Sequence, residues 1–286
     1  MPAETGAGRA GVTASPVGEV AAVLFDIDDT LVDLERAMGR TLQSIPDPAL
    51  DHLGDDDWVR YKALYTADPQ RHYGRFLAGE LTFEEQRVHR VRHARAGFTP
   101  EPFLGSVAEA WVRAYEQTLP LHFRAYDDVV PLLDALDDRG VPYGAVSNNV
   151  HDYQRAKLDR AGLQRIRVLV GIDTVGVAKP EPAIYREGAR LLHTDPARTL
   201  YVGDNLVVDA QGARAAGLVG VWLDRAGGSA APGVPSRAGR SAAATCAGTR
   251  DAGTGERGDA SGSSEPEEVP RIGGLDAVLQ FLPSVR

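Results

Sequence analysis

Short apolar runs alternate with amphipathic segments along much of the chain, and this pattern predicts the fold. The apolar runs read as buried strands, because they lack the two-residue alternation of a strand with one exposed face. They lie at residues 20–25, 141–146, 168–172, 199–202 and 218–223. Segments with helical spacing lie between most of them, at residues 127–139, 152–161, 182–192 and 209–216. This alternation predicts an α/β fold with a doubly wound, Rossmann-like core, in which helices cover both faces of a parallel sheet.

A long helical stretch follows the first predicted strand. Between residues 34 and 122, apolar residues such as Trp58, Tyr61 and Tyr65 recur at roughly helical spacing, and no run there reads convincingly as a strand. We therefore expect an inserted helical domain over residues 34–122. The core would then be formed by residues 19–33 and 123–225.

Two stretches differ in composition from the rest. Residues 1–18 and 226–270 are rich in small and polar residues and poor in large apolar ones. Such segments cannot bury enough apolar surface to offset the entropy lost on ordering, so we expect a disordered leader and a flexible insert. Apolar residues return near the end of the chain, which predicts a closing core helix within residues 271–286.

Composition narrows the functional classes. The 286 residues carry a formal net charge of −9 and no Lys/Arg block long enough to follow a nucleic-acid backbone, which argues against nucleic acid as a partner. Neither a signal-peptide pattern nor an apolar run of bilayer length is present, so no membrane partner is expected. The single cysteine, Cys246, fits a reducing compartment. We therefore expect a cytoplasmic protein and leave its oligomeric state open.

Two acidic residues follow the first predicted strand directly. Asp26 and Asp28 stand two positions apart, so their side chains should lean the same way. An aspartate is ionised at pH 7 and can attack an electrophile without a helper base. A carboxylic acid beside it can protonate a leaving group and later activate water. Aspartate also favours ordinary turns, so this pair by itself does not define a site.

A second acidic pair follows the strand at residues 199–202. Asp204 and Asp209 would be costly beside a buried strand unless a cation or hydrogen bonds satisfied them. Carboxylate oxygens from both pairs would suit Mg²⁺, which would also reduce the repulsion between an aspartate nucleophile and a phosphate. We expect Asp204 to ligate the metal and Asp209 to orient it from behind.

Two further strand ends carry groups that suit a phosphate. Ser147 and Asn148 come where a strand meets a helix N-terminus, so a hydroxyl and backbone N–H groups could bind phosphate oxygens. Lys179 follows the strand at residues 168–172, and its ammonium could neutralise the phosphate and the nucleophile. The alternatives without a binding role are an ordinary helix N-cap for Ser147 and Asn148 and a solvated surface lysine for Lys179. All four segments follow the carboxyl ends of strands, where open α/β sheets bind ligands.

The order of these segments resembles the haloacid dehalogenase superfamily of hydrolases. That family is marked by DxDx[TV], a Ser/Thr, a Lys and GDxxxxD, which match residues 26–30, Ser147, Lys179 and residues 203–209. The resemblance covers residues 20–33 and 122–225. It departs from the pattern at position 29, where an aspartate replaces the glycine of many members.

The resemblance implies roles for individual residues. Asp26 would be the nucleophile that becomes an aspartyl-phosphate, and Asp28 the acid and base. Mg²⁺ would be held by Asp26, the Asp28 backbone carbonyl and Asp204. Residues 34–122 would be the α-helical cap that closes over the substrate.

The expected function is Mg²⁺-dependent hydrolysis of a phosphomonoester on a small metabolite. A 2-haloacid dehalogenase would need neither the metal nor an acid at Asp28, so Asp28 and Asp204 argue against it. A sugar phosphomutase would share the first motif and stays open. A binding protein that has lost catalysis is a further alternative, although every expected catalytic group is present.

Overall fold

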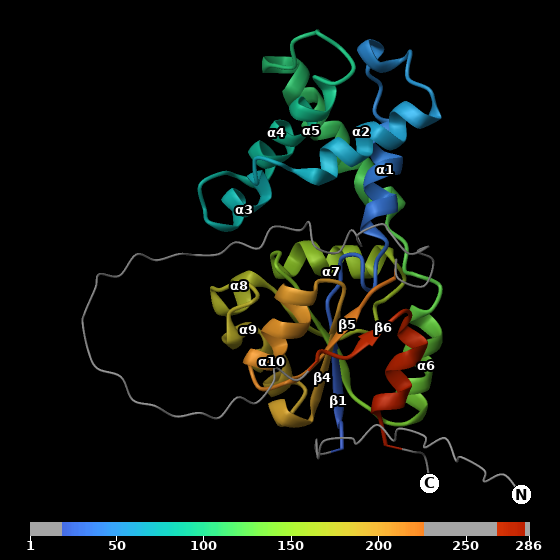
Figure 1. Ribbon diagram of the computed structural model, residues 1–286, viewed down its shortest axis with the longest axis vertical. Coiled ribbons are helices and arrows are strands. Elements are labelled where there is room, and N and C mark those ends of the chain that lie inside the picture. The colour runs from blue at the N-terminus through green and yellow to red at the C-terminus, as the bar shows by residue number, and fades with distance from the viewer. Residues whose placement is uncertain (1–18, 226–267, 284–286) are drawn as a thin grey trace, which may run out of the picture.

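The computed structural model describes residues 19–225 and 268–283 of the chain. The leader expected over residues 1–18, Cys246 and, apart from residues 268–270, the insert expected over residues 226–270 lie outside the described residues. Within the described residues, the core is a parallel sheet of six strands (Figure 1). The strands are β1 (Ala22–Phe25), β2 (Tyr143–Val146), β3 (Val168–Val170), β4 (Thr199–Gly203), β5 (Val219–Leu223) and β6 (Arg271–Ile272).

The strand order β3-β2-β1-β4-β5-β6 places β1 between β2 and β4. Phe25 pairs with Ala145 on one side and with Val202 on the other, so the three strands end close to the same level. Polar residues that follow these strands are therefore delivered to one edge of the sheet. The chain thus has the doubly wound, Rossmann-like core predicted from the alternation of apolar and amphipathic segments.

Helices cover both faces of the sheet (Figure 1). The helices of the core are α6 (Val129–Asp138), α7 (His151–Arg160), α8 (Ile172–Val175), α9 (Pro182–Leu191), α10 (Gly212–Ala215) and the 3₁₀ helices η3 (Pro196–Arg198) and η6 (Leu275–Phe281). Val23 and Phe25 of β1 pack in the cluster that contains the apolar side of α6, and Leu24 packs in the cluster that contains α9. This alternation is the reason why β1 reads as a continuous apolar run, since both of its faces are buried.

Two local features differ from the sequence prediction. The helix expected at residues 209–216 is a π-helix, η4 (Leu206–Gln211), followed by α10. The backbone N–H groups of Asp209 and Ala210 both donate to the Asn205 carbonyl, which widens this turn. The end of the chain adds strand β6 before η6, so the closing segment is a short strand and a 3₁₀ helix.

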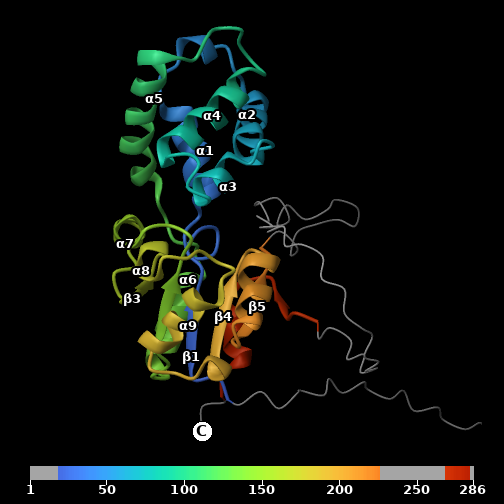
Figure 2. The ribbon, with the colours of Figure 1, turned by 90° about the vertical axis from the view of Figure 1, so that its left-hand side faces the viewer.

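A separate group of helices lies between β1 and β2 in the sequence and beyond one end of the core in space (Figures 1 and 2). Its elements are α1 (Leu34–Ser44), η1 (Pro48–Leu50), α2 (Asp55–Ala67), α3 (His72–Leu77), α4 (Phe83–Arg95), α5 (Gly105–Thr118) and η2 (Leu119–His122). Buried aromatic side chains hold it together: Tyr65 lies 6.0 Å from Tyr115 between ring centroids, and Trp111 stacks on Tyr115 at 4.9 Å. Tyr65 is one of the residues whose helical spacing predicted this group of helices.

The helical group also contacts the core. The Tyr73 hydroxyl of α3 donates to the Asn148 carbonyl at 3.4 Å, and the Phe83 ring of α4 meets the Tyr153 ring of α7 edge-on at 5.6 Å. Both contacts fall at the edge of the sheet where the polar strand ends gather. None of the described helices combines the length and the apolar character that a membrane crossing needs.

Candidate active site

Polar groups from four loops meet at the carboxyl edge of the sheet. Asp26 follows β1, Ser147 follows β2, Lys179 follows β3 and α8, and Asp204 follows β4. Asp26, Ser147 and Lys179 are buried, and Asp204 is half-buried. The structure therefore brings the predicted segments together, because parallel strands with level ends point their loops toward one place.

Lys179 is the centre of this cluster. Its ammonium donates to Asp26 Oδ1 at 2.5 Å, to Asp209 Oδ1 at 2.7 Å and to the Tyr201 hydroxyl at 3.0 Å. Burial opposes the charged form of Lys179, but Asp209 and Asp26 outweigh it and raise the lysine pKa well above its usual range. A buried ammonium is tolerated here because two carboxylates and a hydroxyl satisfy its three hydrogens.

Three carboxylates crowd around this lysine. Asp26, Asp204 and Asp209 each place an oxygen within 4.8 Å of the others. Burial raises the pKa of Asp26 to about 7 against the opposing effect of Lys179, and burial together with Asp209 and Asp26 raises the pKa of Asp204 well above its usual range. The cluster thus holds three carboxyl groups against one ammonium, and without a further cation burial favours the protonated form of Asp26 and Asp204. Oxygen ligands at this spacing fit a hard divalent cation such as Mg²⁺.

Three groups donate hydrogen bonds to the Asp209 carboxylate. Oδ1 accepts from Lys179 and, at 3.3 Å, from the Tyr201 hydroxyl, and Oδ2 accepts from the backbone N–H of Asn205 at 3.0 Å. Both oxygens of Asp209 are thus held in place. A Cβ atom on Gly203 would lie 2.5 Å from Cβ and Oδ2 of Asp209, so the glycine makes room for this carboxylate. The absence of a side chain at Gly203 is therefore what leaves room for Asp209, the last residue of the 203–209 motif.

The half-buried Asp204 is positioned through its backbone. Its N–H donates to Thr30 Oγ1 at 3.0 Å, and its carbonyl accepts from the Trp222 indole at 3.0 Å. Thr30 is fully buried at the end of the 26–30 motif. This hydrogen bond ties the first motif to the last one and fixes the distance between β1 and the loop after β4.

Asp28 lies apart from the three-carboxylate cluster. Its Oδ1 forms an ion pair with Lys157, and its Oδ2 accepts from the Gln154 amide at 3.0 Å. Both partners lie on α7, so Asp26 and Asp28 are held by different lysines although they were expected to lean the same way. The Asp28 carboxylate keeps 29% exposure, against 9% for Asp26. Metal ligation through the Asp28 carbonyl stays a prediction.

The next residue, Asp29, adopts a left-handed backbone with φ of 59°. Glycine adopts this conformation freely and aspartate is among the residues that tolerate it, which accounts for the exchange of the two at this position. Its Oδ1 accepts from the Glu35 N–H at 2.8 Å, at the start of α1. Burial raises the pKa of Asp29 to about 7.

Ser147 and Asn148 follow β2 as predicted, and their side chains have protein partners. Ser147 Oγ accepts from Gln154 Nε2 at 2.5 Å. The Asn148 amide brackets the Lys179 peptide, since Oδ1 accepts from the Lys179 N–H at 2.6 Å and Nδ2 donates to the Lys179 carbonyl at 3.0 Å. Asn148 therefore holds the lysine loop in place, a contact that was not expected from the sequence.

Several residues of the site were missed at the level of sequence. These are Tyr73, Gln154, Lys157 and Tyr201. Gln154 and Lys157 are three positions apart on one helix, a spacing that places them on the same face. That spacing was the available signal, but α7 carries many polar residues and gave no reason to single out this pair.

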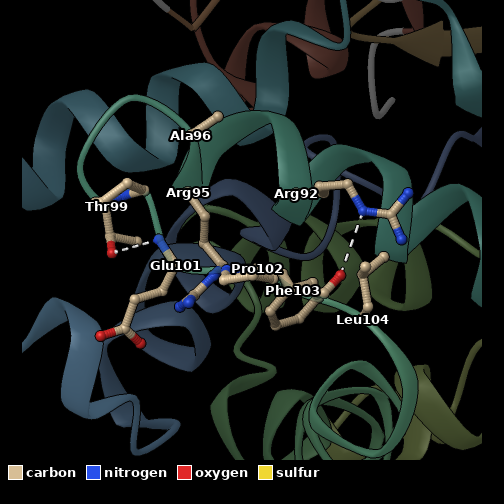
Figure 3. A pocket seen from close by; sticks show the side chains of 9 residues that line it. Arg92, Arg95, Ala96, Thr99, Glu101, Pro102, Phe103 and Leu104 are labelled. Carbon is tan, nitrogen blue, oxygen red and sulfur yellow. Dashed lines mark hydrogen bonds between the residues drawn. The ribbon is translucent and has the colours of Figure 1, made fainter.

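The helical group contains a hollow of its own, away from these residues. Figure 3 shows it at the end of α4 and the following loop. Its volume is about 330 Å³. Two hydrogen bonds within its wall join Arg92 to the Phe103 carbonyl at 3.3 Å and the Glu101 N–H to Thr99 Oγ1 at 3.2 Å. No predicted site residue lines this hollow, so the convergent polar cluster of the core defines the candidate active site.

Comparison with known proteins agrees with this geometry. The family model described as haloacid dehalogenase-like hydrolase matches residues 20–217. A glyceraldehyde 3-phosphate phosphatase of Methanopyrus kandleri is 32% identical over 72% of this chain and 84% of its own length. A phosphoglycolate phosphatase of Xylella fastidiosa is 34% identical over 70% of this chain and 80% of its own length.

A solved structure shows the same fold. The HAD-hydrolase YfnB of Bacillus subtilis, determined with bound magnesium, superimposes with a TM-score of 0.62 at 21% identity, over 93% of this chain and 99% of that one. The family match extends across β1, the helical group and the core up to residue 217, and it includes every segment that contributes to the polar cluster. The chain therefore belongs to the haloacid dehalogenase-like hydrolases.

Proposed function

We propose that this hydrolase is a Mg²⁺-dependent phosphatase that cleaves phosphomonoesters of small metabolites through an aspartyl-phosphate. The observation that carries the proposal is the cluster in which Asp26, Asp204 and Asp209 lie within 4.8 Å of one another around Lys179. Three carboxyl groups against one ammonium would carry a net negative charge when ionised, which suits a divalent cation, and the cation would draw a phosphate to Asp26. The names of the two relatives support a small phosphorylated substrate.

The proposed reaction has two displacements. A carboxylate oxygen of Asp26 attacks phosphorus, the bond to the ester oxygen breaks, and Asp28 gives its proton to the departing alkoxide. Water then attacks the aspartyl-phosphate, Asp28 takes the proton of that water, and Asp26 is released with inorganic phosphate. Ser147, the Asn148 N–H and Lys179 stabilise the phosphate oxygens during both steps.

Mg²⁺ would be held by Asp26, the Asp28 carbonyl and Asp204, with Asp209 orienting the site from behind Asp204. When bound, the ion supplies positive charge that lowers the repulsion between the nucleophile and the phosphate. The residues suit it, because their carboxylates offer oxygen ligands and burial already disfavours the uncompensated charge of Asp26 and Asp204.

We further propose that α1–α5 form a cap that closes over the substrate. The contact of Tyr73 with the Asn148 carbonyl supports this role, since it places a residue of α3 against the loop that carries Ser147. A small phosphorylated metabolite is the proposed partner. We also propose a cytoplasmic location and no nucleic-acid or membrane partner, on the basis of composition alone.

The competing functions make different demands on the same residues. A 2-haloacid dehalogenase needs no cation and no acid at position 28, so the three-carboxylate cluster and the buried support of Asp28 favour the phosphatase. A phosphomutase would return the phosphoryl group to its substrate instead of to water. A non-catalytic binding protein would bind the metabolite or the cation without releasing phosphate.

Phosphate release from a panel of phosphorylated metabolites tests the proposal. The panel should include glyceraldehyde 3-phosphate, phosphoglycolate and phosphoserine, each with Mg²⁺ and with EDTA. We expect phosphate release that EDTA abolishes, and its loss in Asp26→Asn but not in Asp51→Asn, a change at an exposed aspartate. Metal-independent chloride release from 2-chloropropionate would support the dehalogenase, and an isomeric phosphate without free phosphate would support the mutase. Inertness on every substrate would support the binding protein.

A further inference from the structure

Helix α7 buries two polar side chains that face the first motif. Gln154 and Lys157 have 0% and 2% exposure. Elsewhere on the same helix, Asp152, Asp159 and Arg160 are exposed. Removing an ammonium from water costs several kcal/mol unless a partner compensates it, by the general behaviour of buried ions. The burial of the Lys157 ammonium therefore depends on the groups that it contacts.

The partner of Lys157 is the Asp28 carboxylate. Among the described residues, Lys157 forms its ion pair with Asp28. The ammonium also lies 5.4 Å from the centroid of the Phe123 ring and 5.2 Å from that of the Tyr153 ring. The two rings cover the ammonium and attract it through their π-systems. Water is thus kept from one side of the ion pair.

Gln154 completes the support of Asp28. Its Nε2 donates to Asp28 Oδ2 at 3.0 Å and to Ser147 Oγ at 2.5 Å, while Lys157 binds Asp28 Oδ1. Each carboxylate oxygen of Asp28 therefore has one partner from α7, and the same glutamine fixes the hydroxyl of Ser147. Two contacts on two oxygens define both the position and the rotation of a carboxylate.

We propose that Lys157 is a positioning residue for the reaction, which acts through Asp28 with the help of Gln154. This inference rests on the proposed function, because it assigns Asp28 the transfer of a proton to the leaving group and from water. Lys157 fixes the carboxylate where it can reach the leaving oxygen, and its charge compensates the carboxylate between the two steps. Asp28 alone, with 29% exposure, would rotate among solvated conformations.

Lys179 cannot take this role. Its ammonium is fully used by Asp26, Asp209 and Tyr201 on the other side of the site. The chain therefore carries two buried lysines near its first motif, and each holds one of the two aspartates. A single lysine would leave one carboxylate without a cation.

A double-mutant cycle tests the inference. The variants are Lys157→Met, Asp28→Asn and the double variant, assayed with Mg²⁺ on phosphoglycolate and on p-nitrophenyl phosphate. We expect Lys157→Met to lower kcat on phosphoglycolate by about 10- to 100-fold, the range seen when outer partners of a catalytic group are removed, with KM changed within about twofold. In the Asp28→Asn background the same change should alter kcat by less than about twofold, since its target is gone.

The choice of leaving group separates positioning from general damage. An alkoxide leaving group needs the proton from Asp28, whereas p-nitrophenolate leaves readily without it. The loss in kcat/KM, which covers the steps up to the departure of the leaving group, should therefore be much smaller on p-nitrophenyl phosphate than on phosphoglycolate. A merely structural role would lower both kcat/KM values equally. Arg95→Met is the matched control, because it removes another buried cation, paired with Asp47 in the helical group, and should leave kcat within about twofold.

Gln154→Leu keeps the test valid if Lys157→Met does not fold, since it leaves no buried charge behind. It should lower kcat on phosphoglycolate more in the wild-type background than in Asp28→Asn, where only its contact with Ser147 is lost. Equal losses in kcat in both backgrounds, or equal losses in kcat/KM on both substrates, would overturn the role of Lys157 while the phosphatase stands. A wild-type chain that releases no phosphate would instead contradict the proposed function and this inference with it.

Discussion

Replacing Lys179 by methionine tests the electrostatics of the site most directly. The substitution keeps an unbranched side chain of similar length but removes a charge that lies 2.5 Å from Asp26 and 2.7 Å from Asp209. At an effective dielectric constant of about 20, each contact corresponds to roughly 6 kcal/mol of attraction, most of which is cancelled by the cost of burying the charges. Deleting one partner of a buried ion pair typically costs about 3–5 kcal/mol, because the remaining charge stays buried without compensation.

We therefore expect Lys179→Met to lower the free energy of unfolding by about 3–5 kcal/mol and the melting temperature by roughly 6–20 °C. The measurement is urea unfolding and calorimetry at pH 8 in EDTA. At pH 5 the loss should be smaller, because the uncompensated carboxylates can then take up protons. Activity should be lost with every phosphomonoester, including p-nitrophenyl phosphate.

Lys62→Met is the matched control. Lys62 pairs with Glu35 at 2.8 Å, but the two side chains keep 27% and 44% exposure. Exposed pairs contribute about 0–1 kcal/mol, so this variant should unfold close to the wild type. If Lys179→Met were as stable as Lys62→Met at pH 8, the carboxylates around Lys179 would not depend on its charge, and the electrostatic account of the cluster would be wrong.

Three further predictions concern the same cluster. Gly203→Ala places a methyl group against Asp209 and should destabilise the protein by about 1–3 kcal/mol in urea unfolding; an unchanged midpoint would contradict the steric account. Thr30→Val removes the acceptor of the Asp204 N–H and should weaken Mg²⁺ binding in calorimetric titration, whereas an equal affinity would show that Thr30 does not position Asp204. Burial raises the pKa of Asp26 in the folded protein to about 7, from a reference value of 3.8. Without metal, the contribution of Asp26 to the free energy of unfolding is therefore highest at low pH. It falls by a few kcal/mol at most as the pH rises between these two pKa values. In EDTA, the melting temperature should therefore fall less from pH 5 to pH 8 in Asp26→Asn than in the wild type. An equal fall in both proteins would refute this link between the pKa of Asp26 and stability.

Much of the core could be predicted because its strands are buried on both faces. A run such as Ala22–Phe25 is apolar throughout, and the first polar residue after it marks the carboxyl edge of the sheet. That rule placed Asp26, Ser147 and Asp204 at the site without any knowledge of the fold. Strand β6 escaped prediction because its two residues are too few to form a pattern, and Arg271 is exposed.

The π-helical turn at Leu206–Gln211 was not predicted for a different reason. Apolar spacing over six residues does not distinguish a π-turn from the first turns of an α-helix. The turn arises because the Asn205 carbonyl accepts two N–H groups while the Asn205 side chain accepts from the N–H groups of Val207 and Val208. These hydrogen bonds form only when the backbone follows this path, so the spacing of apolar residues does not reveal them. π-turns of this kind recur at functional sites.

Support from distant segments could not be predicted from the sequence at all. Lys157 lies 129 positions from Asp28, and Tyr73 lies 75 positions from Asn148. Lysine is mostly a surface residue, so a single lysine within a polar helix gives no sign that it is buried. Only the packing of α7 against the end of β1 turns it inward. The sequence thus predicts the groups that follow strands and misses the groups that reach them from helices.

The two aspartates of the first motif are held in ways that suit different tasks. Asp26 is almost enclosed and shares Lys179 with Asp209, so its carboxylate is desolvated beside the place where a cation would bind. A nucleophile gains from this arrangement, because little water has to be removed before it attacks. Asp28 is held by Lys157 and Gln154 but keeps nearly a third of its carboxylate exposed. A group that must reach a leaving oxygen and then a water molecule, as proposed for Asp28, needs that access. The division between two lysines thus fits the proposed roles of an enclosed nucleophile and an accessible acid.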